Sequence, residues 1–208
     1  MLISIEGNIG SGKSTIINYL KTLQTDKIIF VDEPVSEWLE IKDKDGVNAL
    51  DCFYKNKKEN AFCFQVLAYI TRLKKLMDII KTSKDAIIIT ERSIETDKNV
   101  FAKMLYDEGM FNSIQWETYN YWFDTFKDIS QVNMILYVKT NPIKCLERIH
   151  IRNRVEESNI TLEYLDNCHK YHENWIKDSM TNIITIDGHN TIEFIQNEVS
   201  IYINSLSI

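Results

Sequence analysis

The chain has 208 residues, of which 44% are hydrophobic and 26% charged, and its 30 acidic against 24 basic side chains give a formal net charge of −6. This length fits one ordinary domain with a sizeable hydrophobic core, and the composition is that of a folded globular protein. The acidic balance excludes a nucleic-acid binder that relies on a broad basic field. Small anionic ligands are still compatible with it if basic residues gather locally.

The cysteines and the N-terminal segment bear on the compartment. The four cysteines form no C-x-x-C pair, and the first residues lack the layout of a secretory signal. We therefore expect a cytoplasmic protein with reduced thiols. No run of residues approaches the roughly 18 apolar residues that a membrane span requires, so we expect neither membrane nor nucleic acid as a partner.

Short β-branched runs alternate with longer segments of helical period, which is the pattern of βαβ units around a parallel sheet. The expected strands are 2–5, 27–31, 86–90, 133–138 and 182–186. The expected helices are 13–24, 59–83, 95–128 with a break near Gly109, 141–152, 160–178 and 191–205. No repeat or linker divides the chain. We predict a single α/β domain over residues 1–208, with a five-stranded parallel sheet flanked by helices in three layers.

Half of the six glycines lie between the first strand and the first helix, in the segment Gly7-Asn8-Ile9-Gly10-Ser11-Gly12-Lys13-Ser14. This segment fits the P-loop pattern G-x-x-x-x-G-K-[ST]. In such a loop the backbone N–H groups converge on phosphate oxygens, the helix N-terminus adds partial positive charge, and the lysine reaches the outer phosphates. We predict a P-loop fold that binds ATP through residues 7–15, Thr15 included. Lys13 is expected to act in catalysis, and the hydroxyl of Ser14 to bind Mg²⁺.

Charged residues follow the second and third strands. Glu33 comes after one, and Glu91-Arg92-Ser93 after the other. Because ligands of open α/β sheets bind outside the carboxyl ends of the strands, we expect these residues at the edge that carries the P-loop. A phosphoryl acceptor needs a positioned base, the metal needs a carboxylate, and the transferred group needs cationic donors. Taken alone, either cluster also fits a solvated strand end.

The helix expected at 59–83 carries two stripes. The core stripe recurs at spacings of four and three and comprises Phe62, Val66, Tyr69, Leu73, Leu76 and Ile80. Gln65, Ala68 and Arg72 share a second face of the helix. The amide of Gln65 can donate and accept along a nucleobase edge, a geometry suited to adenine or cytosine. This stripe alone fits an exposed helix face equally well.

Three arginines, Arg148, Arg152 and Arg154, lie at the end of the helix expected at 141–152. A mobile segment at about 148–160 could close these arginines over bound phosphates, exclude water and stabilise charge in the transition state. We predict an arginine-rich lid that helps to bind ATP. An ordinary salt-bridged helix end is the alternative interpretation.

In their order and spacing these elements resemble the deoxyribonucleoside kinase family, which includes deoxycytidine, deoxyguanosine and mitochondrial thymidine kinases. The resemblance runs from Ile3 to about Trp175. It is carried by the P-loop, Glu33-Pro34-Val35 with Trp38, Phe64-Gln65, Glu91-Arg92-Ser93, and Arg152-x-Arg154-x-Glu156-Glu157. The chain departs from the family pattern at Asn153 and Val155, inside the predicted lid.

The resemblance implies roles for single residues. Glu33 matches the general base for the nucleoside 5′-hydroxyl, and Arg92 matches the arginine that contacts this hydroxyl and holds the base. Glu91 matches the acid associated with Mg²⁺. Tyr54 and Glu157 match the pair that holds the sugar 3′-hydroxyl.

The same resemblance assigns the nucleobase pocket. Trp38 lines this pocket, and Gln65 pairs with the base edge beside Ala68. Arg72 and Asp97 match a pair found in the deoxycytidine and deoxyguanosine kinase branch. Such a pair offers donors and acceptors while crowding a thymine methyl group. It therefore favours deoxycytidine and purine deoxynucleosides over thymidine.

The function predicted in this way is transfer of the ATP γ-phosphoryl group to the 5′-hydroxyl of a deoxynucleoside, in nucleotide salvage. A nucleoside monophosphate kinase of the thymidylate type is one alternative, although Glu33 would repel a bound acceptor phosphate. A non-catalytic nucleotide-binding subunit is the other. The aromatic residues of 116–126 cover more than one helix face, and the family forms homodimers, so a homodimer is expected.

Overall fold

The computed structural model describes residues 1–23, 27–83 and 86–206. Residue 24, the last of the helix expected at 13–24, lies outside the described residues, and so does the side chain of Glu156, which belongs to the motif of the predicted lid.

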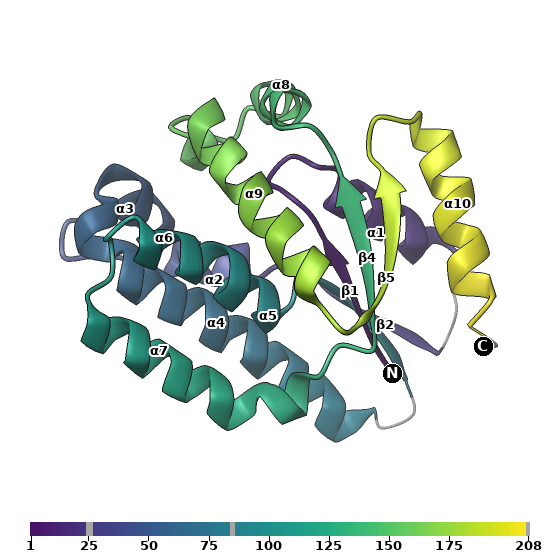
Figure 1. Ribbon diagram of the computed structural model, residues 1–208, viewed down its shortest axis with the longest axis horizontal. Helices are drawn as coiled ribbons and strands as arrows, with labels where there is room; N and C mark the ends of the chain where they lie inside the picture. Colours follow the sequence, from purple (N-terminus) through teal and green to yellow (C-terminus); the bar gives the residue numbers. More distant parts are fainter. Residues whose placement is uncertain (24–26, 84–85, 207–208) are drawn as a thin grey trace.

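Five parallel strands form the centre of the molecule (Figure 1), in the order β2-β3-β1-β4-β5. Their bounds are Leu2–Glu6 for β1, Ile28–Val31 for β2, Ile87–Glu91 for β3, Met134–Lys139 for β4 and Asn182–Asp187 for β5. Each expected strand is thereby confirmed to within a residue at either end. The strands are mostly apolar because helices cover both faces of a parallel sheet.

Helices α1 (Lys13–Thr22) and α10 (Ile192–Asn204) cover one face of the sheet, and α4 (Lys57–Thr82) and α9 (Leu162–Asp178) cover the other (Figure 1). Successive side chains of a strand point to opposite faces. In β1, Ile3 and Ile5 accordingly pack against α1 and α10, whereas Leu2 lies in the core cluster that includes residues of α4 and α9. The predicted three-layer α/β fold is confirmed.

The helix expected at 95–128 is divided into several parts. The structure has α5 (Ile94–Thr96), a π-helical turn η1 (Asp97–Ala102), α6 (Lys103–Asp107), α7 (Ser113–Phe126) and a 3₁₀ turn η2 (Lys127–Ser130). The break near Gly109 is confirmed, since that glycine has a φ of +72°, in the region that favours glycine. α7 begins with a capping box, in which Asn112 and Gln115 exchange side-chain and backbone hydrogen bonds.

Two helices were not expected, α2 (Val35–Glu40) and α3 (Ala49–Lys55). With six and seven residues they are too short to show a helical period. α4 begins two residues earlier than expected because the side chain of Asn56 caps it by accepting from the backbone N–H of Glu59.

The remaining elements surround the carboxyl ends of the strands. α8 (Pro142–Arg152) ends at Asn153 in a left-handed conformation with a φ of +51°, and a 3₁₀ turn η3 (Val155–Glu157) follows. Among the helices of the described residues, none is long and apolar enough to cross a membrane.

Candidate active site

A cavity of about 670 Å³ opens between the P-loop, α4 and the end of α8. It brings together nearly all of the predicted site residues: Ile9, Gly10, Ser11, Gly12, Lys13, Ser14, Thr15, Glu33, Trp38, Tyr54, Gln65, Ala68, Arg72, Glu91, Arg92, Asp97, Arg148, Arg152, Arg154 and Glu157. Gly7 and Asn8 do not line it. Asn8 instead donates from its side-chain amide to the carbonyl of Leu165 at 2.8 Å and so anchors the loop to α9.

The glycines of the P-loop are needed for close packing. A Cβ at Gly7 would lie 2.5 Å from the carbonyl oxygen of Val138, and one at Gly10 would lie 2.5 Å from that of Cys145. Both glycines also have positive φ, of +142° and +78°, which side chains rarely tolerate. The loop is therefore pressed against β4 and α8.

Lys13 and Ser14 face the cavity at the start of α1. The Lys13 Nζ donates to the carbonyl of Asn8 at 2.8 Å, and burial together with the Arg92 guanidinium lowers the pKa of Lys13 to about 8. The Ser14 hydroxyl donates to Glu91 Oε1 at 2.9 Å. A hydroxyl and a carboxylate oxygen side by side at a phosphate-binding loop are ligands that Mg²⁺ accepts.

Glu33 follows β2 and lies between two guanidinium groups. Arg92 Nε and Arg72 Nη2 both donate to its Oε1, each at 3.2 Å. Desolvation by itself raises the pKa of Glu33, but Arg92, Arg72 and Lys13 together lower it below the ordinary value. Glu33 is thus an oriented carboxylate at neutral pH. Its Oε2 receives no hydrogen bond from the described residues and can accept one from an alcohol.

The backbone of Arg92 adopts the left-handed conformation, which is unusual for a residue other than glycine, with a φ of +65°. Such a conformation costs about 1–3 kcal/mol and is found where the surroundings enforce it, often at functional sites. The Arg92 backbone N–H donates to Ile5 at 3.1 Å, its Nη1 donates to the carbonyl of Gly7 at 2.9 Å, and the guanidinium lies 4.8 Å from the ring centre of Phe101. These contacts aim the guanidinium at Glu33.

Arg72 and Asp97 form a buried ion pair, with Arg72 Nε donating to Asp97 Oδ2 at 2.9 Å. Arg72 Nη1 also donates to the carbonyl of Glu91 at 2.6 Å. Burial opposes the charge of Arg72, but Asp97 and Glu33 outweigh it and raise the pKa of the guanidinium. The pair is therefore fixed at the inner end of the cavity.

The second stripe of α4 is buried, so the alternative of an exposed helix face is wrong. Gln65, Ala68 and Arg72 are 3%, 4% and 4% exposed. Among the described residues nothing pairs with the Oε1 of Gln65, although the side chain lines the cavity. Trp38 donates from its indole to Thr71 at 3.0 Å and meets the Phe64 ring edge-on at 5.4 Å. The result is an aromatic slot with one unpaired buried amide oxygen.

Tyr54 and Glu157 line the same cavity from α3 and η3. Burial raises the pKa of Tyr54 well above its ordinary value, so its hydroxyl stays a hydrogen-bond donor. Glu157 is held by Arg152 Nη2 at 2.6 Å and lies 3.6 Å from Arg154 Nη1. Among the described residues no hydrogen bond joins Tyr54 to Glu157.

The chain is similar to known proteins over most of its length. The model of the family described as "Deoxynucleoside kinase" matches residues 3–205. The chain is 35% identical over 194 residues to deoxycytidine kinase of Homo sapiens, covering 84% of this chain and 74% of the relative. It is 38% identical over 180 residues to a probable deoxycytidine kinase of fowlpox virus, covering 85% and 72%. It is 30% identical over 200 residues to mitochondrial deoxyguanosine kinase of Xenopus laevis, covering 87% and 75%.

The chain belongs to the deoxynucleoside kinase family. It is an ATP-dependent phosphotransferase. The similarity to deoxycytidine and deoxyguanosine kinases favours this activity over the alternatives of a monophosphate kinase and of a non-catalytic subunit.

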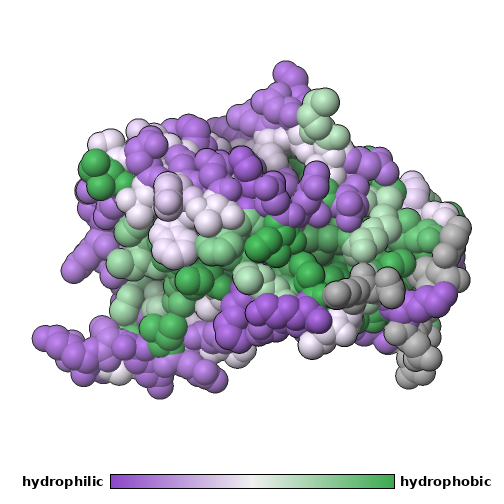
Figure 2. Space-filling model, turned by 90° about the horizontal axis from the view of Figure 1, so that it is seen from below, coloured by the Kyte–Doolittle hydropathy of each residue, from purple (hydrophilic) through white to green (hydrophobic). Residues whose placement is uncertain are grey.

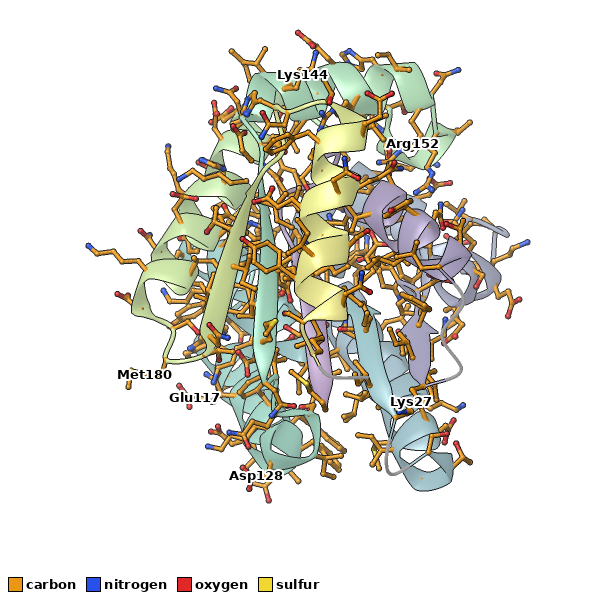
Figure 3. All side chains as sticks on the ribbon, turned by 90° about the vertical axis from the view of Figure 1, so that its right-hand side faces the viewer. Lys27, Glu117, Asp128, Lys144, Arg152 and Met180 are labelled. Atoms are coloured by element: carbon orange, nitrogen blue, oxygen red, sulfur yellow. The ribbon has the colours of Figure 1, made fainter. Side chains whose placement is uncertain are left out.

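The three arginines predicted as a lid have different partners in this deoxynucleoside kinase. Arg148 Nη1 donates to the carbonyl of Ser11 at 2.9 Å and its Nη2 to that of Gly188 at 2.8 Å, so Arg148 supports the P-loop itself. Arg152 and Arg154 are more exposed and contact Glu157. Figure 3 shows Arg152 at one end of α8 and Lys144 at the other, above the carboxyl ends of the strands.

Several residues that line the cavity of the kinase were not predicted. Asn190 follows β5 at the same edge as the other strand ends, so the rule applied to Glu33 would have found it. Phe101 and Tyr164 also line the cavity, but their sequence pattern is that of ordinary core residues and gives no signal.

Proposed function

We propose that this kinase transfers the γ-phosphoryl group of ATP to the 5′-hydroxyl of a deoxyribonucleoside, with Glu33 as the general base. The nucleoside O5′ forms a bond to the γ-phosphorus, the bond from that phosphorus to the β–γ bridging oxygen breaks, and ADP leaves. The proton of the 5′-hydroxyl passes to Glu33 Oε2. The observation that carries the proposal is the position of Glu33, which faces the cavity with Oε1 held by Arg92 and Arg72.

The donor side of the proposal consists of the P-loop and the arginines. Residues 7–15 form the phosphate cradle, in which Lys13 carries a positive charge and α1 presents its N-terminus. Arg152 and Arg154, in a lid at about 148–160, add cationic donors that offset charge on the transferred group. Arg148 holds the cradle in place through Ser11.

We infer Mg²⁺ as the cofactor, held by Ser14 and Glu91 together with the phosphates. The oxygens of these side chains are 2.9 Å apart at the mouth of the P-loop. The described residues contain no cluster of three or more His, Cys, Asp or Glu that could hold a metal alone. This agrees with the usual binding of Mg²⁺ by one or two protein groups plus substrate phosphates. The ion would neutralise charge on the β- and γ-phosphates.

The acceptor is proposed to be deoxycytidine or a purine deoxynucleoside rather than thymidine. The Arg72–Asp97 pair and the unpaired oxygen of Gln65 offer both donors and an acceptor to a base that carries an amino group. The named relatives are deoxycytidine and deoxyguanosine kinases. A panel of four deoxynucleosides with radiolabelled ATP tests this preference. A kcat/KM highest for thymidine contradicts it.

The decisive experiment for the reaction is Glu33→Gln. This change keeps the volume of the side chain but removes the proton acceptor, so kcat is expected to fall by about 10²-fold or more while nucleoside binding is retained. Glu37→Gln is the matched control, because Glu37 lies in α2 only four residues further along and pairs with Lys75 outside the cavity. Unchanged turnover in Glu33→Gln refutes the assignment of the base.

We also propose a homodimer formed through α4 and α7. Figure 2 shows hydrophobic residues gathered on one face of the molecule. Ile70 of α4 is 45% exposed, and Ile114, Tyr121 and Trp122 of α7 are 73%, 75% and 46% exposed. Such a patch is typical of an interaction surface. Static light scattering that gives a monomer mass at micromolar concentration contradicts this proposal.

We further propose a place in nucleotide salvage, because a nucleoside kinase makes monophosphates from preformed nucleosides. A cytoplasmic location stays a prediction. The compartment is supported by the thiols: Cys52, Cys63, Cys145 and Cys168 are all free.

A further inference from the structure

Glu6, the last residue of β1, is a fully buried carboxylate that no prediction used. It accepts hydrogen bonds from three hydroxyls, those of Ser4, Ser93 and Thr96, the one from Ser93 at 2.8 Å. Among the described residues it forms no ion pair. Buried carboxylates are costly unless each oxygen is satisfied, so a carboxylate held only by neutral hydroxyls calls for a reason.

The three hydroxyls belong to two different segments. Ser4 lies two residues before Glu6 on the same face of β1, so its hydrogen bond stays within the strand. Ser93 and Thr96 belong to the turn 92–97 that follows β3, Ser93 as the N-cap of α5 and Thr96 as its last residue. Ser93 Oγ also accepts from the backbone N–H of Thr96 at 3.3 Å and caps α5. Two of the three hydrogen bonds therefore tie this turn to the strand that leads into the P-loop.

This turn contains Arg92 with its strained backbone. The carbonyl of Ile5 accepts from the Arg92 backbone N–H at 3.1 Å, so consecutive residues of β1 hold the turn, Ile5 through its backbone and Glu6 through its side chain. The guanidinium of Arg92 then reaches both Glu33 and the carbonyl of Gly7. Thr96 directly precedes Asp97, the partner of Arg72.

We propose that Glu6 is a positioning residue of the phosphoryl transfer, whose carboxylate fixes the turn 92–97 against the P-loop so that Arg92 and Asp97 are aimed into the acceptor cavity. Glu6 acts through Arg92 and touches neither substrate. The inference rests on the function proposed above for Arg92 and Glu33.

Two variants separate positioning from simple core packing. Thr96→Val and Ser4→Ala each delete one hydroxyl that donates to Glu6, but only the first loosens the turn. Thr96→Val is expected to lower kcat by about tenfold or more, because small displacements of a catalytic group are costly, while KM for ATP stays within about twofold. Ser4→Ala is expected to keep kcat within about twofold. Equal effects of both variants on kcat, or a lowered Tm with unchanged kcat in Thr96→Val, overturn the proposal.

A double-mutant cycle then tests the route through Arg92. Glu6→Gln is expected to lower kcat by about tenfold in the wild-type background but by no more than about twofold in Arg92→Lys, since residues that act through one another are not additive. If Glu6→Gln lowers kcat by the same factor in both backgrounds, the positioning role of Glu6 is overturned, while the role of Arg92 is kept. A full kcat for Arg92→Lys by itself overturns the proposed role of Arg92, and with it the route that Glu6 would use.

Discussion

The arginines around the cavity form two groups that differ in how they are held. The side chains of Arg72 and Arg92 are each 4% exposed, and each donates to a carboxylate and to a backbone carbonyl. The side chains of Arg152 and Arg154 are 31% and 48% exposed and share Glu157 as partner. Both groups line the cavity, and the function proposed above puts the first group on the acceptor side.

This difference implies different tasks. A buried arginine with several acceptors cannot leave its place without abandoning hydrogen bonds in a medium that offers no replacement. Arg72 and Arg92 therefore hold Glu33 in one orientation before any substrate binds. An exposed ion pair is worth little because water competes for both partners. Arg154, which is 48% exposed and 3.6 Å from Glu157, can consequently exchange this carboxylate for a phosphate at small cost. Arg152 is held more firmly, because its Nε and Nη2 both donate to Glu157, which is only 12% exposed.

The largest expected effect is on stability, from Asp97→Ala. Removing Asp97 leaves the buried Arg72 without its closest partner, and breaking such a pair costs about 3 kcal/mol or more. Urea denaturation is expected to show this loss in the free energy of unfolding. Asp78→Ala is the control, because Asp78 pairs with Lys74 on the exposed side of α4. Equal midpoints for the two variants would mean that burial of the Arg72 pair does not matter.

The next effect is on activity, from Arg154→Ala. If this arginine moves onto the transferred group, its loss is expected to lower kcat/KM for ATP by about tenfold and to leave the unfolding midpoint unchanged. Lys144→Ala is the control, since Lys144 is equally exposed, at the other end of α8, and pairs with Glu147. A fall in stability without a fall in kcat/KM would place Arg154 with the structural arginines and remove the contrast.

The donor side was easier to predict from sequence than the acceptor side. The P-loop is one contiguous pattern in which glycine, lysine and serine positions follow from phosphate geometry, and the structure agrees with it. Glu33, Gln65 and Asp97 are far apart in the chain, so residue chemistry alone left them ambiguous between a site and a solvated surface. The order of strands at one sheet edge, and the family resemblance, brought them together.

Other features depend on packing that sequence does not encode locally. Glu6 stands immediately before the P-loop pattern, yet its partners Ser93 and Thr96 lie 87 and 90 residues further along the chain, just after β3. The register of β1 against β3 brings them together. Arg148 looked like a third lid arginine because it shares a helix face with Arg152. Its contacts to Ser11 and Gly188 depend on where β5 ends.

The smallest expected effect concerns Glu157. This carboxylate pairs with the exposed arginines Arg152 and Arg154, and like Tyr54 it also lines the cavity. Glu157→Gln is expected to raise KM for a deoxynucleoside about fivefold, the equivalent of one hydrogen bond of about 1 kcal/mol, with kcat little changed. The 2′,3′-dideoxy analogue provides the control, since it lacks the 3′-hydroxyl. Wild type and variant should then have the same KM. If the variant instead raises KM for both nucleosides equally, Glu157 acts by anchoring Arg152 and Arg154 rather than by contacting the sugar.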